Sequence, residues 1–460
     1  MRVIFGRGVR SIGQFTAVAA IIFGLPVRYA LGQVQQPQNP YSPAYGHPYR
    51  HGAVPTREAW KKMRQWWAAH AANGVAAPAT SGSTSTGDLT FQGGTNGIGV
   101  VSGIPKVYLV FWGSQWINGG DPNGAATYLQ DFYTGIGTGG ETWSGTMTQY
   151  CDGSTVFKGA TSCPSGASLV GYPSNGALAG VWFDDSAAVP TDATQAQIAA
   201  EAVAAAAHFG NTSAASNRYA QYVIAFPSGA DPDGFPNAGF CAWHDYTSSS
   251  YGDIAYTNLP YQTDAGTQCG EYYVNGSAGT LDGFSIVGGH EYAETLTDML
   301  PTGGWCDSSL GCSTHEDGDE CAWIPPGQPG GAADVVMGNG SYAMQSTWSN
   351  NDPNGECVIS HVIEGSSIGA PSFDTPQVVQ RTSFSVTYRV GWTSVSNATS
   401  YAVWELWNGY PSSGSFSYYS SFSTTDIEVG VPKGSWVYLE VQACNASECG
   451  NFSGQEELVY

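Results

Sequence analysis

The residues of this chain best suited to chemistry lie close together in the segment 288–298. His290 and Glu294 are four residues apart, so a helix would place their side chains one above the other on the same face. Zinc accepts both an imidazole nitrogen and a carboxylate oxygen as ligands, and Glu291 would stand beside them as a general base. The spacing therefore predicts a metal site that activates a water molecule for hydrolysis.

This pattern differs by one residue from the H-E-x-x-H motif of zinc metallopeptidases, because Glu294 replaces the second histidine. The segment 281–300 carries apolar residues at a loose helical spacing, and either Thr280 or Asp282 can cap its start. The two glycines at 288–289 are poor helix formers, which indicates that another part of the molecule approaches closely there. The alternative interpretation is a surface helix with solvated acidic side chains.

A third ligand must come from elsewhere, since a catalytic zinc usually has three protein ligands. The segment 315–321, with the sequence HEDGDEC, follows the predicted helix. We expect Glu316 or Asp319 to complete the site, with His315 as a further candidate. A cluster of acids around a glycine is equally typical of a calcium loop, because calcium binds many oxygens. The sequence therefore predicts Zn²⁺ at the helix and leaves Ca²⁺ as a second cation for this loop.

Two residues outside this set are expected to assist. Asp298 lies four residues beyond Glu294, and we expect it to orient His290 or the start of the following loop rather than to bind the metal. His244 is a candidate catalytic group that would stabilise the transition state. A histidine beside an aromatic residue is also often a packed, hydrogen-bonded core residue, so both interpretations of His244 stay open.

The N-terminus has the pattern of a signal peptide over residues 1–32. Three arginines in the first ten residues precede an apolar run at 15–25, and small residues follow near the expected cut. This run is too short to anchor the chain in a bilayer, and no other segment approaches eighteen apolar residues. We therefore expect a secreted protein without a membrane span, with its mature N-terminus near Gln33.

Ten cysteines fit an oxidising compartment, and their even number permits complete pairing. No C-x-x-C pair is present, which argues against a structural zinc ribbon. Proximity along the chain suggests five short-range bridges, two of which would brace the acidic loop: Cys151 with Cys163, Cys241 with Cys269, Cys306 with Cys312, Cys321 with Cys357, and Cys444 with Cys449.

The charge is distributed unevenly along the chain. Nine of the fifteen Lys and Arg residues lie at or before Arg64, whereas positions 81–460 hold six basic and thirty-six acidic residues. The resulting balance of −30 argues against nucleic acid and anionic membranes as partners.

Residues 33–88 are expected to be a pro-segment or a linker. The stretch from 33 to about 51 is rich in Gln, Pro, Asn and Tyr, which predicts disorder, and 76–87 predicts a flexible linker. Between them, residues 58–72 predict a short basic helix with one side formed by Trp60, Met63, Trp67 and His70. A basic helix tethered to an acidic body would suit a pro-segment that docks over the active site. The alternative is a spacer or a cell-surface tether.

Two domains are expected to follow. Residues 89–362 carry predicted buried strands at 106–113 and 219–226 and an alanine-rich helix at 194–209, which together with the metal-site helix predict an α+β main domain. Residues 371–460 consist of alternating strands separated by turns, which predicts an all-β sandwich of the immunoglobulin or fibronectin type III kind.

Several segments, taken in order, resemble the phosphate-induced/exordium-like secreted family and its bacterial relatives: YLVFWGSQW at 108–116, GFCAWH at 239–244, the helix motif, GW at 304–305 and EDGDEC at 316–321. The bacterial relatives carry H-E-x-x-E-x-x-T-D, a G-W and E-x-G-D-x-C in the same order. The resemblance covers roughly residues 95–360. It implies a secreted α+β domain with a metallopeptidase-like helix, and metal-binding or metal-supporting roles for Glu316 and Asp319.

These features predict a secreted zinc-dependent endopeptidase that cleaves extracellular proteins or peptides. Zinc would be held by His290, Glu294 and one of Glu316 and Asp319, with Glu291 as the general base. One alternative is a non-catalytic extracellular protein whose C-terminal module and aromatic surface bind a cell-wall polymer or another protein. The other is an acid peptidase that uses paired carboxylates without a metal.

Overall fold

The structure is a computed structural model that describes residues 38–70, 88–352, 355–365, 368–395, 397–408, 416–445 and 449–460. The predicted signal peptide and the predicted linker at 76–87 lie outside the described residues. Among the described residues, no helix is both long and apolar enough to cross a membrane.

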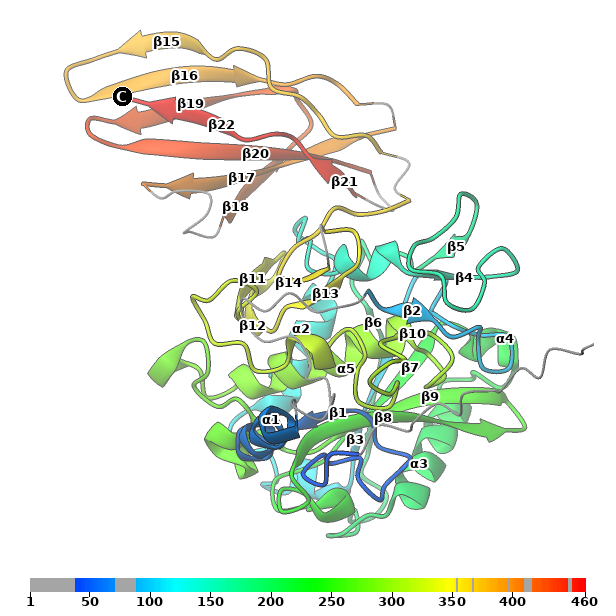
Figure 1. The fold of residues 1–460 in the computed structure, drawn as a ribbon. Coiled ribbons are helices and arrows are strands. Elements are labelled where there is room, and N and C mark those ends of the chain that lie inside the picture. Colours follow the sequence, from blue (N-terminus) through cyan, green and yellow to red (C-terminus); the bar gives the residue numbers. More distant parts are fainter. Residues whose placement is uncertain are drawn as a thin grey trace, which may run out of the picture. The chain divides into compact units, whose positions relative to one another are not determined.

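The main domain is built on a six-stranded mixed sheet with the order β1-β8-β9-β7-β3-β6 (Figure 1). The four strands from β9 to β6 are parallel, whereas β8 runs antiparallel to β9 and β1 runs antiparallel to β8. The predicted strands at 106–113 and 219–226 are confirmed as β3 and β7. The strands are β1 (His51–Pro55), β8 (Phe240–Ser249), β9 (Gly252–Leu259), β7 (Ala220–Ala225), β3 (Lys106–Trp112) and β6 (Leu178–Asp184).

Helices α3 (Gln195–His208) and α5 (Asp282–Thr297) cover opposite faces of this sheet (Figure 1). Successive side chains of a strand point to opposite faces, and β7 shows both contacts. Tyr222 accepts a hydrogen bond from Asn211, just beyond α3, whereas the amide of Gln221 donates to the backbone of α5. Helices thus shield the parallel strands on both sides, as parallel sheets require.

Helix α5 is buried along its whole length, so the interpretation of a surface helix with solvated acids is wrong. The close approach indicated by the two glycines is made by core side chains. A β-carbon at Gly289 would lie 2.6 Å from Cε of Met344, and one at Gly288 would lie 3.0 Å from the hydroxyl of Tyr133. A buried helix that carries His290, Glu291 and Glu294 must satisfy these side chains inside the protein.

Smaller elements complete the main domain. Two helices, α2 (Ala125–Gly135) and the short α4 (Ala214–Asn217), pack around the sheet and α5. The remaining strands form two-stranded pairs: β2 (Thr90–Phe91) with β10 (Trp305–Cys306), β4 (Cys151–Asp152) with β5 (Ser168–Leu169), β11 (Ala333–Met337) with β12 (Gly340–Met344), and β13 (Thr347–Ser349) with β14 (Glu356–Val358).

The N-terminal segment is ordered from residue 38, so the predicted disorder up to about residue 51 is wrong for the part that is described. Buried Arg50 pairs with Asp233 at 2.7 Å, which fixes the stretch before β1. The predicted basic helix is confirmed as α1 (Arg57–His70), and its buried residues are Trp60, Met63 and Trp67. This segment is folded onto the main domain because β1 joins the main sheet.

The C-terminal region contains two antiparallel sheets that share a core of Val390, Trp392, Val403, Val429 and Val441, an arrangement compatible with a β-sandwich. One sheet has the order β15 (Gln377–Arg381), β16 (Ser385–Gly391) and β19 (Asp426–Pro432). The other is formed by β18 (Ser417–Phe422), β17 (Ser400–Trp407), β20 (Trp436–Cys444), β21 (Cys449–Phe452) and β22 (Glu456–Val459).

All five predicted disulfides are present, and no cysteine is free. Cys306–Cys312 lies just before the acidic loop, and Cys321–Cys357 holds its end. Five disulfide bridges are consistent with an extracellular protein.

Candidate metal centre

Helix α5 carries the three motif residues and is anchored to the sheet beneath it. The Gln221 amide on β7 donates to the Glu291 carbonyl at 3.1 Å and to the Thr295 hydroxyl at 3.0 Å. These bonds connect the helix backbone with the central strand, so the helix cannot rotate without losing buried hydrogen bonds. His290, Glu291 and Glu294 are each completely buried as a result of this packing.

Gln345 fixes the orientation of the His290 ring. Its amide nitrogen donates to the carbonyls of Gly318 and Ser346, which leaves its Oε1 as an acceptor 3.2 Å from Nδ1 of His290. Nδ1 must therefore carry the proton, and burial, which lowers the pKa of His290, keeps the ring neutral. The lone pair of Nε2 is then directed away from Gln345, as in a typical metal-binding histidine.

That lone pair faces carboxylate oxygens. Nε2 of His290 lies 2.9 Å from Oε1 of Glu294 and 3.8 Å from Oδ1 of Asp319. Two acceptor atoms at 2.9 Å repel each other unless a cation or a proton lies between them. His290, Glu294 and Asp319 offer ligand atoms that all lie within 4.8 Å of one another, so this group can hold a metal ion. Nitrogen and carboxylate oxygen are a donor set that zinc accepts.

The acidic loop packs directly against the helix. The amide of Asp319, in the short 3-10 helix Asp319–Cys321, donates to Oε1 of Glu294 at 2.9 Å. A β-carbon at Gly318 would lie 2.9 Å from that same oxygen and 2.9 Å from Nδ1 of His290, so a larger residue would push the loop away. The predicted convergence of the helix and the acidic loop is thus what the structure shows.

His244 lies on the other side of Glu294. It projects from β8 and is buried, with Nδ1 3.2 Å from Oε2 of Glu291 and Nε2 3.5 Å from Oε2 of Glu316. Nδ1 is also 3.6 Å from Oε2 of Glu294, and His244, Glu291 and Glu294 form a second group able to hold a metal ion. Glu294 is shared by the two groups because its two oxygens face different histidines.

Several ligand atoms at the centre have no hydrogen-bond partner among the residues that the structure describes. They are Nε2 of both histidines, Oε1 of Glu291, Oε2 of Glu294 and both carboxylate oxygens of Glu316. Buried polar atoms of folded proteins are nearly always paired, and an exception calls for a ligand or an ion. The orphaned atoms and the donor types therefore fit a bound cation.

Burial and mutual repulsion of the acids raise the pKa values at the centre. Burial raises the pKa of Glu291, Glu294 and Glu316 well above the usual range, and neighbouring carboxylates add to the rise. Burial likewise raises the pKa of Asp317 to about 7 and that of Asp319 to about 6. Burial lowers the pKa of His244, which is therefore neutral at pH 7. Ionising these buried carboxyl groups is therefore costly unless a cation neutralises their charge.

The structure separates the predicted site residues into two sets. His290, Glu291, Glu294, Glu316, Asp319 and His244 come together. His315 instead pairs with Glu320 at 3.1 Å, away from both groups. Asp298 accepts hydrogen bonds from the amides of residues 302–304, so it holds the loop after α5 and does not contact His290.

Three residues near the centre were missed by the sequence analysis. Gln345 and Gly52 come from distant parts of the chain and belong to no motif, so nothing in the sequence pointed to them. Asp317 lies within the predicted acidic loop and is buried beside Glu316, yet its neighbours were favoured over it. An acidic residue in such a cluster could have been included on composition alone.

Comparisons with known proteins do not assign this chain to a family. No family model matches it, and no curated protein matches it. Among solved structures, titin kinase with its flanking domains is 16% identical, with a TM-score of 0.17, over 20% of this chain and 17% of that one. A myokine structure is 14% identical, with a TM-score of 0.16, over 20% of this chain and 95% of that one. The Endo-D glycoside hydrolase domain from Streptococcus pneumoniae R6 is 18% identical, with a TM-score of 0.15, over 27% of this chain and 18% of that one. Likeness at this level carries no argument about function.

Proposed function

We propose that this protein is a secreted, metal-dependent endopeptidase, with zinc as the expected cation. The observation that carries the proposal is the contact of 2.9 Å between Nε2 of His290 and Oε1 of Glu294, inside a buried group completed by Asp319. Two acceptors held this close need a proton or a cation between them, and a cation would be held by His290, Glu294 and Asp319. The five disulfides support an extracellular location.

Residues of this chain supply the proton transfer. A zinc ion, when bound, would contribute Lewis acidity that polarises a substrate carbonyl and a nearby water. Glu291 is the group placed to accept the proton of that water, because its Oε1 has no hydrogen-bond partner among the described residues. His244, with Nδ1 3.2 Å from Oε2 of Glu291, would orient that carboxylate by donating its single N–H to it.

Glu316 is the ligand candidate that the geometry places differently from the others. It lies 3.5 Å from His244 and is not in the group of His290, Glu294 and Asp319. Between the two predicted third ligands, Asp319 is therefore the better one, and Glu316 would hold His244 in place. Calcium is the other cation that so many buried carboxylates can attract.

The family and module resemblances enter as part of this proposal. The helix motif and the acidic loop, which the exordium-like resemblance links by order alone, are in direct contact through Glu294 and Asp319. His244 from the GFCAWH segment joins the same cluster. For the C-terminal region we propose an immunoglobulin-like or fibronectin type III-like module, because its two sheets share one core. We further propose that this module binds a cell-wall polymer or another protein.

A second candidate function has its own support. The raised pKa values of Glu291, Glu294 and Glu316 resemble those of carboxyl groups that share protons. A metal-independent acid peptidase with paired carboxylates would have this property. Peptide hydrolysis at pH 4 in the presence of a chelator would favour this candidate, because histidine ligands are protonated there and lose zinc.

The deciding experiment is metal analysis of the purified secreted protein by mass spectrometry, with casein hydrolysis measured on the same samples before and after a proteolytic cut within residues 71–87. Wild type should contain about one zinc per chain, as a single catalytic site requires, and Glu294→Ala should lose both zinc and activity. Glu356→Ala removes an exposed glutamate from β14 and is the matched control that should keep both. No zinc in wild type, or calcium alone that Glu294→Ala leaves unchanged, would overturn the metallopeptidase and favour an extracellular binding protein.

A further inference from the structure

Strand β1 lies over the candidate metal centre as the outermost strand of the sheet. It pairs antiparallel with β8, with His51 opposite His244 and Val54 opposite Ala242. Without β1, the edge of the sheet would be β8, the strand that carries His244. A free strand edge presents unpaired backbone N–H and C=O groups, which bind another extended chain readily. Residues 51–55 therefore occupy an edge that an extended peptide can also use.

Gly52 brings the main chain of β1 closest to the acidic cluster. A β-carbon at this position would clash with Oε2 of Glu294 and would lie 2.6 Å from Cε1 of His244. The φ of Gly52 is +51°, in the left-handed region that glycine adopts without steric cost. Only a residue without a side chain fits here, so the backbone itself reaches the cluster.

Strand β1 also lies beside the elements that carry the residues proposed to act in catalysis. Strand β1 packs against α5, which carries His290, Glu291 and Glu294, and against the 3-10 helix that carries Asp319. A peptide substrate must place its main chain beside the metal ligands and the general base. Strand β1 thus lies where a substrate would lie.

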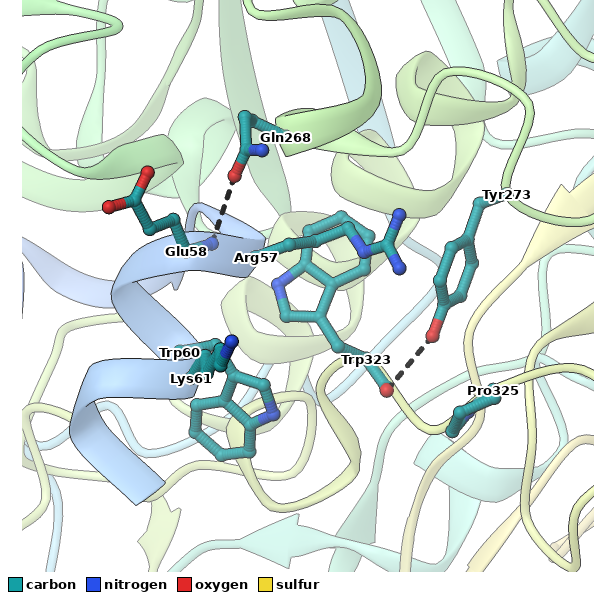
Figure 2. A pocket seen from close by; sticks show the side chains of 8 residues that line it. All are labelled: Arg57, Glu58, Trp60, Lys61, Gln268, Tyr273, Trp323 and Pro325. Atoms are coloured by element: carbon teal, nitrogen blue, oxygen red, sulfur yellow. Dashed lines mark hydrogen bonds between the residues drawn. The ribbon is translucent and has the colours of Figure 1, made fainter. Parts of the chain in front are cut away.

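Contacts on either side of β1 hold it in this position. The indole of Trp323 donates to the carbonyl of Pro55 at 2.7 Å, and the amide of Thr56 donates to the carbonyl of Gly239 at 2.8 Å. Beyond Pro55, helix α1 rests on the body, where Figure 2 shows Arg57 and the backbone of Glu58 facing Trp323, Tyr273 and Gln268. A pocket of about 500 Å³ remains between these residues, so α1 does not fill the space beside the end of β1.

Residues 38–70 are linked covalently to the body of the protein through the main chain alone. Residues 38–70 contain no cysteine, so no disulfide connects them to the body, and they rejoin it only through residues 71–87. They hold five basic residues and one acidic residue, opposite in sign to the body. A cut in 71–87 would leave the segment held by noncovalent contacts alone, and charge attraction would weaken with salt.

We propose that the edge of β8 is a peptide-binding site that accepts an extended polypeptide antiparallel to β8 with a glycine over Glu294, and that residues 51–55 fill it in the uncut chain. The hydrolytic part of this inference rests on the proposed function, whereas the binding part does not. The uncut chain is then latent, and a cut within 71–87 followed by loss of the N-terminal segment opens the site.

The binding part is tested with a fluorescent peptide of residues 47–58. The full chain carries a recognition site for a specific protease within 71–87, and fluorescence anisotropy is measured before the cut and after removal of the released segment. The peptide should bind after the cut only, and a peptide with Gly52→Val should bind at least tenfold more weakly. No binding after the cut, equal binding before and after it, or equal binding of the two peptides overturns the proposal.

The latency is tested with two alanine variants of the uncut chain. Gly52→Ala and Gly46→Ala both place a methyl group on a left-handed residue of the same segment, but a β-carbon at Gly46 has nothing within 4 Å. Gly52→Ala should bind the peptide and hydrolyse casein at least tenfold faster than wild type, while Gly46→Ala should stay latent. If Gly52→Ala binds the peptide but does not hydrolyse casein, the result supports the binding site and contradicts the proposed peptidase activity. Two variants that both behave like wild type in binding and hydrolysis overturn the latency.

Discussion

Glu291 is the carboxylate of the centre whose surroundings suit proton transfer. Its Oε2 faces His244 at 3.2 Å, and its Oε1 is unpaired within the described structure. We predict that Glu291→Gln lowers the rate of peptide hydrolysis by about 10²- to 10⁴-fold, because an amide cannot accept the proton of the attacking water. The rate on a fluorogenic peptide, measured on protein already freed of its N-terminal segment, checks this.

The metal content of Glu291→Gln shows whether the substitution removes a general base or a metal ligand. Glu291→Gln should keep the cation, since His290, Glu294 and Asp319 are unchanged, and Glu356→Gln should keep both metal and rate. If Glu291→Gln lost the metal with the activity, Glu291 would be a ligand, as its grouping with His244 and Glu294 permits.

Gln345 should set the metal affinity without binding the metal. It accepts from Nδ1 of His290 and thereby directs Nε2 toward Glu294. We predict that Gln345→Leu weakens zinc binding by about 10- to 100-fold, the usual effect of losing a group that orients a ligand. Competition with a fluorescent chelator measures this. Gln149→Leu is the matched control, since Gln149 is equally buried and bonds Thr146 and Asn350 instead. Equal affinities in the two variants would reduce Gln345 to a packing role.

The site residues that could be predicted from the sequence are those whose types and spacing match a known metal-binding pattern. His290, Glu291 and Glu294 are adjacent on one helix, and Asp319 belongs to an acidic run that few structures could bury without a partner. Gln345 and Gly52 act through contacts that depend on the fold, and glutamine and glycine are too common in this chain to stand out. Chain folding, rather than residue type, makes them part of the site.

At the scale of elements, the hydrophobic periodicity of the sequence predicted the helices and strands that local interactions stabilise. The alanine-rich helix, strands β3 and β7 and the helix of the motif are all found where periodicity placed them. Disorder was predicted wrongly for residues 38–51, because that stretch gains its order from Asp233 and β8, which are far away in sequence. Burial of α5 was equally invisible, since its apolar pattern is no stronger than that of a surface helix.

The disulfide Cys321–Cys357 should couple the acidic loop to the metal. It closes a separation of 36 residues and ends the 3-10 helix that carries Asp319. We predict that Cys321→Ala with Cys357→Ala lowers the free energy of unfolding of the main domain by about 3–4 kcal/mol, as expected for a loop of this length, and also weakens zinc binding. Urea denaturation and chelator competition measure the two effects.

The bridge Cys444–Cys449 supplies the control. It spans only 5 residues in the C-terminal region, so its removal should cost about 2 kcal/mol in the unfolding of that region. Zinc affinity should not change. An equal loss of zinc affinity in both double variants would show that the effect comes from general destabilisation, not from the acidic loop.

At the scale of the whole molecule, the buried acids should make stability depend on the metal and on pH together. Burial raises the pKa of Asp298 and Asp317 to about 7, above the value of an unfolded aspartate. Such groups stabilise the fold when protonated, and this contribution is lost as pH rises through the folded pKa. The lowered pKa values of His244 and His290 act in the opposite direction, but only below the ordinary histidine value of 6.5.

The window from pH 6.5 to 8 therefore isolates the acids, and there we predict opposite slopes with and without metal. In a chelator, the free energy of unfolding should fall as pH rises, because Asp298 and Asp317 ionise in a buried, negatively charged site. With zinc, stability should hold or rise, since ligands must be deprotonated to bind. Urea denaturation at both pH values, with and without EDTA, measures this, and Glu294→Ala should follow the chelated slope in both. Parallel slopes in wild type would mean that no cation neutralises these carboxylates, and the acid peptidase would then be the better account of the site.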